Sequence, residues 1–297
     1  MEKLVNRITN FFTKHKILFA FVVVFIVAFL YLSYTEMKEY FSQSDDVGDS
    51  FKYKLCLISI FKNETMNLKT WIEHYIHQGV EHIYLIDNDS DDHPMEILKP
   101  YIDRGYVSYH FMPEKYQQMK NVIIAMEKEN LSNLTEWLII CDLDEFFYGV
   151  PDNLSKTLDE FSEYDIIYSN WRMFGTDGLK EHPSNILKSI LHREPNMNHT
   201  KYIFKPRKVL LNHDTLDHIN SVHRLNADDG KSIIENDKIR LNHYPIQSEE
   251  FFKKVKMTRG DVNLTDMVRD MKYFHDSDQN KTVKDDVLAN ITSEYDH

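Results

Sequence analysis

Asp142 and Asp144 follow an apolar run of strand length, and their spacing suits them to bind a metal ion. Residues 137–141 have the composition of a buried strand, so the end of that strand should place carboxylates at the edge of a sheet. Side chains two positions apart point to the same side of an extended chain. Carboxylate oxygens are hard ligands for Mg²⁺ or Mn²⁺, and the bound ion can in turn bind a diphosphate. The pattern therefore predicts a divalent metal site at Asp142 and Asp144.

Two other predicted strands, over residues 55–61 and 82–86, also end in polar loops. The first continues into Lys62-Asn63-Glu64, and the second continues into the acidic loop 87–93. In open α/β sheets, ligands bind beyond the carboxyl ends of the strands. Three polar strand ends in succession therefore predict one shared ligand site.

Strand-length apolar runs alternate with helical patterns from about residue 54 to residue 147. Such alternation favours an α/β fold with a mostly parallel sheet and helices on both faces. The alternation then loosens, and the remaining patterns predict strands over residues 165–170, 202–211 and 239–244 and helices over 154–161 and 249–258.

The N-terminal part of the chain has the pattern of a membrane anchor. Residues 17–34 contain no charged side chain, and a helix of that length is about long enough to cross the core of a bilayer. Lys and Arg precede this stretch while Glu and Asp follow it, which predicts a cytoplasmic N-terminus and a single-pass type II orientation. A cleaved signal peptide is the alternative, but its apolar core would be shorter and would end at a small-residue cleavage site. We expect a cytoplasmic tail (1–16), a transmembrane anchor (17–35), a stem (36–53), a globular domain (54–276) and a mobile acidic tail (277–297).

The net charge limits the possible binding partners, and the glycosylation motifs indicate the cellular compartment. The formal net charge is −12 and the sequence contains no basic stripe, which argues against nucleic acid as a partner. An anionic substrate is still compatible with this charge, because a bound metal can mask the acids at one site. Nine Asn-X-Ser/Thr motifs occur beyond the predicted anchor, where chance would give about two. They favour a glycoprotein whose globular domain lies in the ER or Golgi lumen or is otherwise extracytoplasmic.

Several segments resemble the nucleotide-sugar glycosyltransferases of the GT-A fold, in particular glycosyltransferase family 92 and its family-2-like relatives. The matching segments follow one another between about residues 54 and 261: Ile60-Phe61-Lys62-Asn63-Glu64, Trp71-Ile72-Glu73-His74-Tyr75, residues 79–90, Asp142-Leu143-Asp144-Glu145-Phe146, residues 171–175, Lys205-Pro206-Arg207, Asn242-His243-Tyr244 and the helix from Ser248. The resemblance implies a Rossmann-like GT-A sheet and an inverting hexosyltransferase. Such an enzyme would move a sugar from a nucleoside diphosphate, with UDP expected, to a hydroxyl of a glycan, protein or lipid.

The resemblance also implies roles for individual residues. Asp144 is expected to bind the divalent metal, Mn²⁺ or Mg²⁺, with His243 as a late third ligand. Asp142 would contact either the metal or the ribose of the nucleotide. Lys62, Asn63 and Asp87 are expected to line the nucleoside pocket, and Glu145 would orient a sugar or be solvated.

An inverting transfer also needs a base that takes the proton of the acceptor hydroxyl. Asp177 is the candidate because it lies where an acceptor loop is expected, and Glu250 is the alternative. Positive charge near the departing diphosphate would come from Lys205 and Arg207 on one strand, or from the helical set Lys253, Lys256 and Arg259.

Two other functions fit part of the pattern. Phosphatases with an aspartyl nucleophile also carry Asp-X-Asp after a buried strand, but their motif continues with Thr or Val where this chain has Phe146. A non-catalytic module that keeps the same fold for binding is the third possibility.

Overall fold

The computed structural model describes residues 31, 50–115, 117–211, 223, 225, 231–259 and 268–293. Two compact units divide the chain, Met1–Ser50 and Phe51–His297. Apart from Tyr31 and residues 50–53, the predicted cytoplasmic tail, anchor and stem lie outside the described residues. Within the described ranges, no helix combines the length and the apolar character that a membrane span requires.

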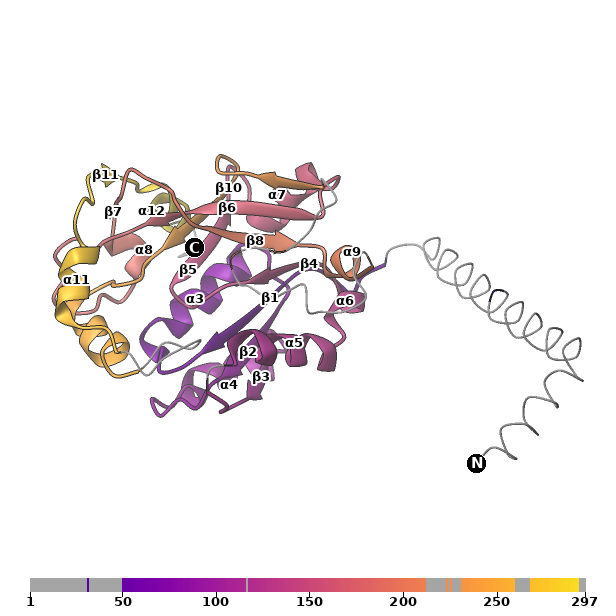
Figure 1. Ribbon diagram of the computed structural model, residues 1–297, viewed down its shortest axis with the longest axis horizontal. Coiled ribbons are helices and arrows are strands. Elements are labelled where there is room, and N and C mark those ends of the chain that lie inside the picture. The colour runs from indigo at the N-terminus through magenta and orange to yellow at the C-terminus, as the bar shows by residue number, and fades with distance from the viewer. Residues whose placement is uncertain are drawn as a thin grey trace, which may run out of the picture. The chain divides into compact units, whose positions relative to one another are not determined.

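Nine strands of the described chain form one mixed sheet (Figure 1). The strands are β1 (Tyr53–Phe61), β2 (His82–Asp87), β3 (Val107–Phe111), β4 (Thr135–Ile140), β5 (Glu145–Gly149), β6 (Ile166–Met173), β8 (Thr200–Phe204), β9 (Ser232–Ile234) and β10 (Ile239–His243). The sheet runs in the order β3-β2-β1-β4-β8-β6-β10-β5, and β9 pairs with β6 beside this path. The first four strands in that order are parallel, whereas β8 runs antiparallel to both of its neighbours. The predicted mixed, mostly parallel sheet is confirmed.

Helices cover both faces of the parallel half of the sheet, as predicted. The helices there are α3 (Thr65–His77), α4 (Met95–Asp103), α5 (Gln118–Lys128) and α6 (Leu131–Leu134). Alternate side chains of β1 point to opposite faces. Leu55 and Leu57 share a core with α3 and α4, while Cys56 and Ile58 share the other core with α5. Because both faces of β1 are buried, its sequence is apolar at nearly every position.

The second half of the domain is built from short elements. They are α7 (Leu154–Thr157), η1 (Leu158–Phe161), α8 (Ile186–Ser189), β7 (His192–Arg193), α9 (Pro206–Leu211), α10 (Glu249–Phe251), the π-helix η3 (Phe252–Lys256), α11 (Met271–Ser277), β11 (Val283–Lys284) and α12 (Val287–Thr292). The strand predicted over 202–211 is wrong beyond Phe204, because Pro206 has no backbone N–H for a sheet and begins a helix instead.

The predicted mobile tail from residue 277 is instead folded as far as Ser293. β11 pairs antiparallel with β7, and α12 packs against α8. Asp285 shows why the acidic composition of this segment led to the wrong prediction. Its carboxylate is 7% exposed and accepts a hydrogen bond of 2.7 Å from Arg193, with Arg172 at 3.8 Å. A buried acidic side chain with two guanidinium partners belongs to the folded domain.

The buried imidazole of His74 predicts a pH-dependent stability. Its Nε2 donates to the carbonyl oxygen of Phe147 at 2.7 Å, and burial lowers the pKa of His74 from 6.5 to about 4. Between these two values the unfolded chain binds the proton and the folded chain does not. The free energy of unfolding should therefore fall as the pH drops from 6.5 toward 4, by up to about 3 kcal/mol.

Chemical denaturation at pH 7 and at pH 4.5 measures this effect. His74→Gln should lose much of the difference between the two pH values, whereas His77→Gln, at an exposed position of the same helix, should keep it. Equal pH dependence in the wild type and in His74→Gln would contradict the assignment.

Candidate active site

The turn between β4 and β5 carries three acidic side chains at the carboxyl end of the parallel strands. Aromatic side chains of α3 hold its backbone in place. The indole N–H of Trp71 lies 3.1 Å from the carbonyl oxygens of both Asp142 and Glu145, and the hydroxyl of Tyr75 donates to the Glu145 carbonyl at 3.0 Å. The packing of α3 on the sheet therefore fixes the backbone of the turn from which the acidic side chains extend.

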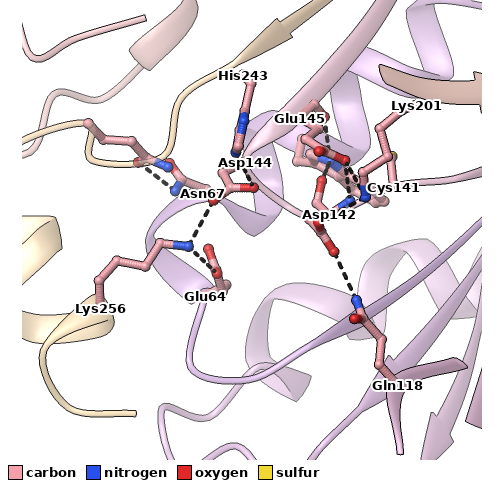
Figure 2. Close-up of polar contacts among 12 residues, drawn as sticks. Glu64, Asn67, Gln118, Cys141, Asp142, Asp144, Glu145, Lys201, His243 and Lys256 are labelled. Carbon is pink, nitrogen blue, oxygen red and sulfur yellow. Dashed lines mark hydrogen bonds and ion pairs between the residues drawn. The ribbon is translucent and has the colours of Figure 1, made fainter. Parts of the chain in front are cut away.

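Lys201 lies between two of these carboxylates and is completely buried (Figure 2). Its Nζ is 3.0 Å from Asp142 Oδ2 and 3.2 Å from Glu145 Oε2. The other oxygen of Asp142 accepts from Gln118 Nε2 at 3.2 Å. Burial alone would lower the pKa of Lys201, but the two carboxylates raise it above its usual value, so its ammonium is charged. Asp142 is thus held by a buried cation and an amide.

Glu145 is the most enclosed of the three acids. Burial raises the pKa of its carboxyl group to about 7, even though Lys201 acts in the opposite direction. Its Oε2 also accepts from the backbone N–H of Asp142 at 2.9 Å, while Oε1 has no hydrogen-bond partner among the described residues. Glu145 therefore stabilises the turn as a buried side chain. The alternative that Glu145 is solvated does not hold.

Asp144 belongs to a second cluster, on the side of the turn away from Lys201. Figure 2 shows it between His243, at the end of β10, and Lys256, at the end of η3. Asp144 Oδ1 is 3.4 Å from His243 Nε2, and Asp144 Oδ2 is 2.8 Å from Lys256 Nζ. Burial would raise the pKa of Asp144, but Lys256 and His243 outweigh it and hold this pKa well below its usual range.

Glu64, in the loop after β1, completes the second cluster. Its Oε1 is 3.2 Å from Lys256 Nζ and also accepts from the guanidinium of Arg259. Its Oε2 is buried and has no partner in the described part of the chain. We call Glu64, Asp144, His243, Lys256 and Arg259 the metal-side cluster, after the metal ion that the sequence predicts at Asp144. Lys256 and Arg259 are two of the cations that the sequence proposed near the diphosphate, whereas Lys253 pairs with Glu249 on the surface.

The loops after β1 and β2 interlock beside this cluster. Asn63, at a φ of 54°, accepts from the backbone N–H of Asp91 at 2.9 Å. Asp87 Oδ1 accepts from the N–H of Ser90 at 2.8 Å, and Lys62 Nζ lies 3.5 Å from Asp89 Oδ2. Of the three predicted nucleoside residues, Lys62 and Asn63 therefore lie on one of two loops that contact each other, and Asp87 ends the strand that leads into the other.

An open pocket of about 460 Å³ lies between these loops and the π-helix. It is lined by Asn63, Thr65, Met66, Asp91, Asp92, Lys254, Val255 and Thr258. These residues include Asn63 and Thr65, which flank Glu64, and Val255, which precedes Lys256. The pocket therefore lies beside the segments that carry Glu64 and Lys256.

The predicted metal ligands do not form one group. In the described ranges, no cluster of three or more His, Cys, Asp or Glu side chains is arranged to hold a metal. Asp144 and His243 are a pair whose facing atoms are close enough to share one ion, but Asp142 is turned to Lys201 and Gln118. A divalent ion that takes its other ligands from water and phosphate oxygens fits two protein ligands.

Trp171 on β6 joins His243 at the rim of the site. Its ring centroid is 4.2 Å from that of His243, 5.1 Å from that of His199 and 5.2 Å from that of His223. The indole N–H of Trp171 is buried and has no partner among the described residues. The sequence analysis included Trp171 in a matching segment but did not predict the three histidines around it. Their positions depend on pairing between distant strands, which a local sequence pattern does not encode.

The two candidate bases have other contacts. Asp177 Oδ2 accepts from the N–H of Leu191 at 2.7 Å and lies 3.1 Å from His192 Nδ1. Glu250 accepts from the N–H of His182 at 2.8 Å and from Lys254 at 2.6 Å. The loop that carries Asp177 starts beside the site, because the N–H of Phe174 donates to the carbonyl of His243 at 2.9 Å.

Comparison with known proteins connects this chain to one family. The family model described as glycosyltransferase family 92 matches residues 52–270. A glycosyltransferase family 92 protein of Ricinus communis is 27% identical over 68% of this chain and 37% of its own length. One of Arabidopsis thaliana is also 27% identical, again over 68% of this chain and 37% of its own length. The chain thus spans less than two fifths of the length of these relatives.

Solved structures with a similar course of the chain include fragments of a bacterial protein. Residues 1–349 of S. aureus TarS in complex with UDP-GlcNAc give a TM-score of 0.44 at 14% identity, covering 82% of this chain and 71% of that one. The same fragment in complex with UDP gives a TM-score of 0.41 at 14% identity, covering 82% of this chain and 70% of that one.

Proposed function

Because this chain belongs to glycosyltransferase family 92, we propose that it transfers a sugar from a nucleoside-diphosphate donor, with UDP as the expected nucleotide, to an acceptor hydroxyl. The observation that carries the proposal is the metal-side cluster next to an open pocket at the carboxyl ends of β1 and β4. Buried acids and cations gathered beside a pocket are typical of a functional site.

The pocket and the loops around it are proposed to bind the donor nucleotide. A volume of about 460 Å³ lies within the usual range for small-molecule sites. Asn63 lines the pocket directly, Lys62 belongs to the same loop, and Asp87 ends β2 and bonds to the loop that follows it. The diphosphate would then face Lys256 and Arg259, which supply positive charge where the leaving group gains negative charge.

Asp144 and His243 are proposed to hold Mn²⁺ or Mg²⁺. The ion would supply positive charge to the diphosphate when both are bound. Asp142 and Glu145, held by Lys201, would keep the turn in position, with Asp142 facing the nucleotide.

The transfer itself breaks the bond between the anomeric carbon and the phosphate oxygen and forms a bond to the acceptor oxygen. The electron pair of the broken bond leaves with the diphosphate, and the acceptor proton goes to a base. We propose Asp177 for that role because its loop starts next to His243, and we propose inversion at the anomeric carbon. A type II anchor formed by residues 17–35, with this domain in the lumen, completes the proposal.

Release of UDP from a panel of UDP-sugars tests the proposed function. With Mn²⁺ and a mixture of mono- and disaccharide acceptors, at least one donor should give UDP faster than the protein-free control, and EDTA should remove the excess. If UDP does not bind in the presence or absence of Mn²⁺, the non-catalytic alternative becomes the better description. A phosphorylated aspartate formed without any nucleotide sugar would favour the phosphatase instead.

A further inference from the structure

Lys256 is an ammonium enclosed between two carboxylates at the position where a donor-bound metal is proposed. Its side chain is 5% exposed, and its Nζ lies 2.8 Å from Asp144 Oδ2 and 3.2 Å from Glu64 Oε1. A buried charge is costly unless it is paired and hydrogen-bonded. The enclosed position of Lys256 therefore depends on both acids.

The formal charges of the metal-side cluster already balance without a divalent ion. Glu64 and Asp144 are negative, and Lys256 and Arg259 are positive. A divalent ion alone would leave this buried cluster with excess positive charge. A nucleoside diphosphate carries more negative charge than one divalent ion cancels, so the ion and the diphosphate together avoid that cost.

Unpaired polar atoms show that the cluster can accept a ligand. Glu64 Oε2, His243 Nδ1 and Arg259 Nε are buried and have no hydrogen-bond partner among the residues that the structure describes. Buried polar atoms are nearly always paired in a complete site. Glu64 Oε2 is an acceptor and Arg259 Nε is a donor, so a ligand with both cationic and anionic parts would satisfy these two atoms.

The position of Lys256 allows it to move. It ends the π-helix η3, a rare wide turn that often occurs at functional sites. Its flexible four-carbon stem lets the ammonium change partner without movement of the backbone. The adjoining pocket is lined by Val255 of the same helix and by Thr65 beside Glu64. The pocket therefore lies beside the helix that carries Lys256.

We propose that in the free protein Lys256 neutralises Asp144 where the metal would bind, and that its ammonium moves from Asp144 to the diphosphate when metal and donor bind together. This inference rests on the proposed function. It predicts that Mn²⁺ binds weakly to the free protein and strongly only with a nucleoside diphosphate. Because the coupling of two ligands is reciprocal, Mn²⁺ and UDP should raise each other's affinity by the same factor, about 5- to 150-fold.

Titration calorimetry of the full chain with Mn²⁺, in the presence and absence of UDP, tests the exchange. Lys256→Met should bind Mn²⁺ about tenfold more tightly than the wild type without UDP, because Asp144 loses its competing cation. The same variant should bind UDP with Mn²⁺ more weakly than the wild type. Lys253→Met is the matched control, since Lys253 lies on the same helix and pairs with Glu249 at the surface.

Each outcome of the titration decides one point. If Lys256→Met and Lys253→Met give the same Mn²⁺ and UDP affinities, the exchange is wrong, although the donor site stands. If UDP binds to neither the wild type nor any variant with Mn²⁺ present, the proposed function fails. Circular dichroism and a melting curve for each variant establish that the comparison is made between folded proteins.

Discussion

Replacing Asp144 with asparagine should lower kcat/KM for UDP release by about 10²- to 10³-fold. Asparagine keeps the shape of the side chain but removes the charge that faces both His243 and Lys256. The site would lose an anionic ligand of the proposed metal, and Lys256 would lose one of its two carboxylate partners. Initial rates of UDP release, measured for both proteins over a range of Mn²⁺ concentrations, give the two values of kcat/KM to be compared.

Asparagine variants of two other aspartates serve as controls for this experiment. Asp152→Asn, which breaks a surface ion pair with Lys156, should leave kcat/KM unchanged. Asp142→Asn should have a smaller effect than Asp144→Asn, because Lys201 and Gln118 already engage both of its oxygens. If Asp142→Asn costs more than Asp144→Asn, the two aspartates have been assigned the wrong roles.

Replacing Lys201 with methionine should lower the free energy of unfolding by about 3–5 kcal/mol. Methionine fills similar space but leaves the carboxylates of Asp142 and Glu145 without the cation that faces both of them. Denaturant titration of the purified variant measures the loss. Adding Glu145→Gln to Lys201→Met should recover part of it, since glutamine at this position is neutral without having to take up a proton.

A surface lysine provides the control for this variant. Lys238 pairs with Glu160, and both side chains are about half exposed. Lys238→Met should leave the free energy of unfolding nearly unchanged, because water screens exposed ion pairs. An equally small effect of Lys201→Met would show that the buried cluster does not stabilise the fold.

The local sequence predicted the parallel half of the fold well. Apolar runs and intervening helical patterns are enough to identify β1, β2 and β4, because each is a strand buried on both faces. The same reasoning failed after Phe204 and beyond residue 277. In both places a partner distant in the sequence decides the structure, as Arg193 does for Asp285.

The sequence paired two residues of the candidate site that the structure also brings together. Asp144 Oδ1 lies 3.4 Å from His243 Nε2, and the role of these two residues as metal ligands stays a prediction. Lys201 was missed because a lysine next to an apolar strand suggests a solvated end. Its burial follows from the insertion of antiparallel β8 between β4 and β6, which depends on pairing between distant strands. The burial of Lys201 therefore could not be predicted from the residues next to it in the sequence.

The long sequence separation within the metal-side cluster has a consequence for the order in which the protein matures. Lys256 contacts Glu64 across 192 residues. At usual rates of translation, roughly 10 to 40 seconds pass between the synthesis of these two residues. During that interval the nascent loop after β1 must keep its carboxylate hydrated, and contacts between distant residues form slowly. A chain that ends before the π-helix would therefore contain all nine strands of the main sheet but would lack the lysine that pairs with Glu64 and Asp144.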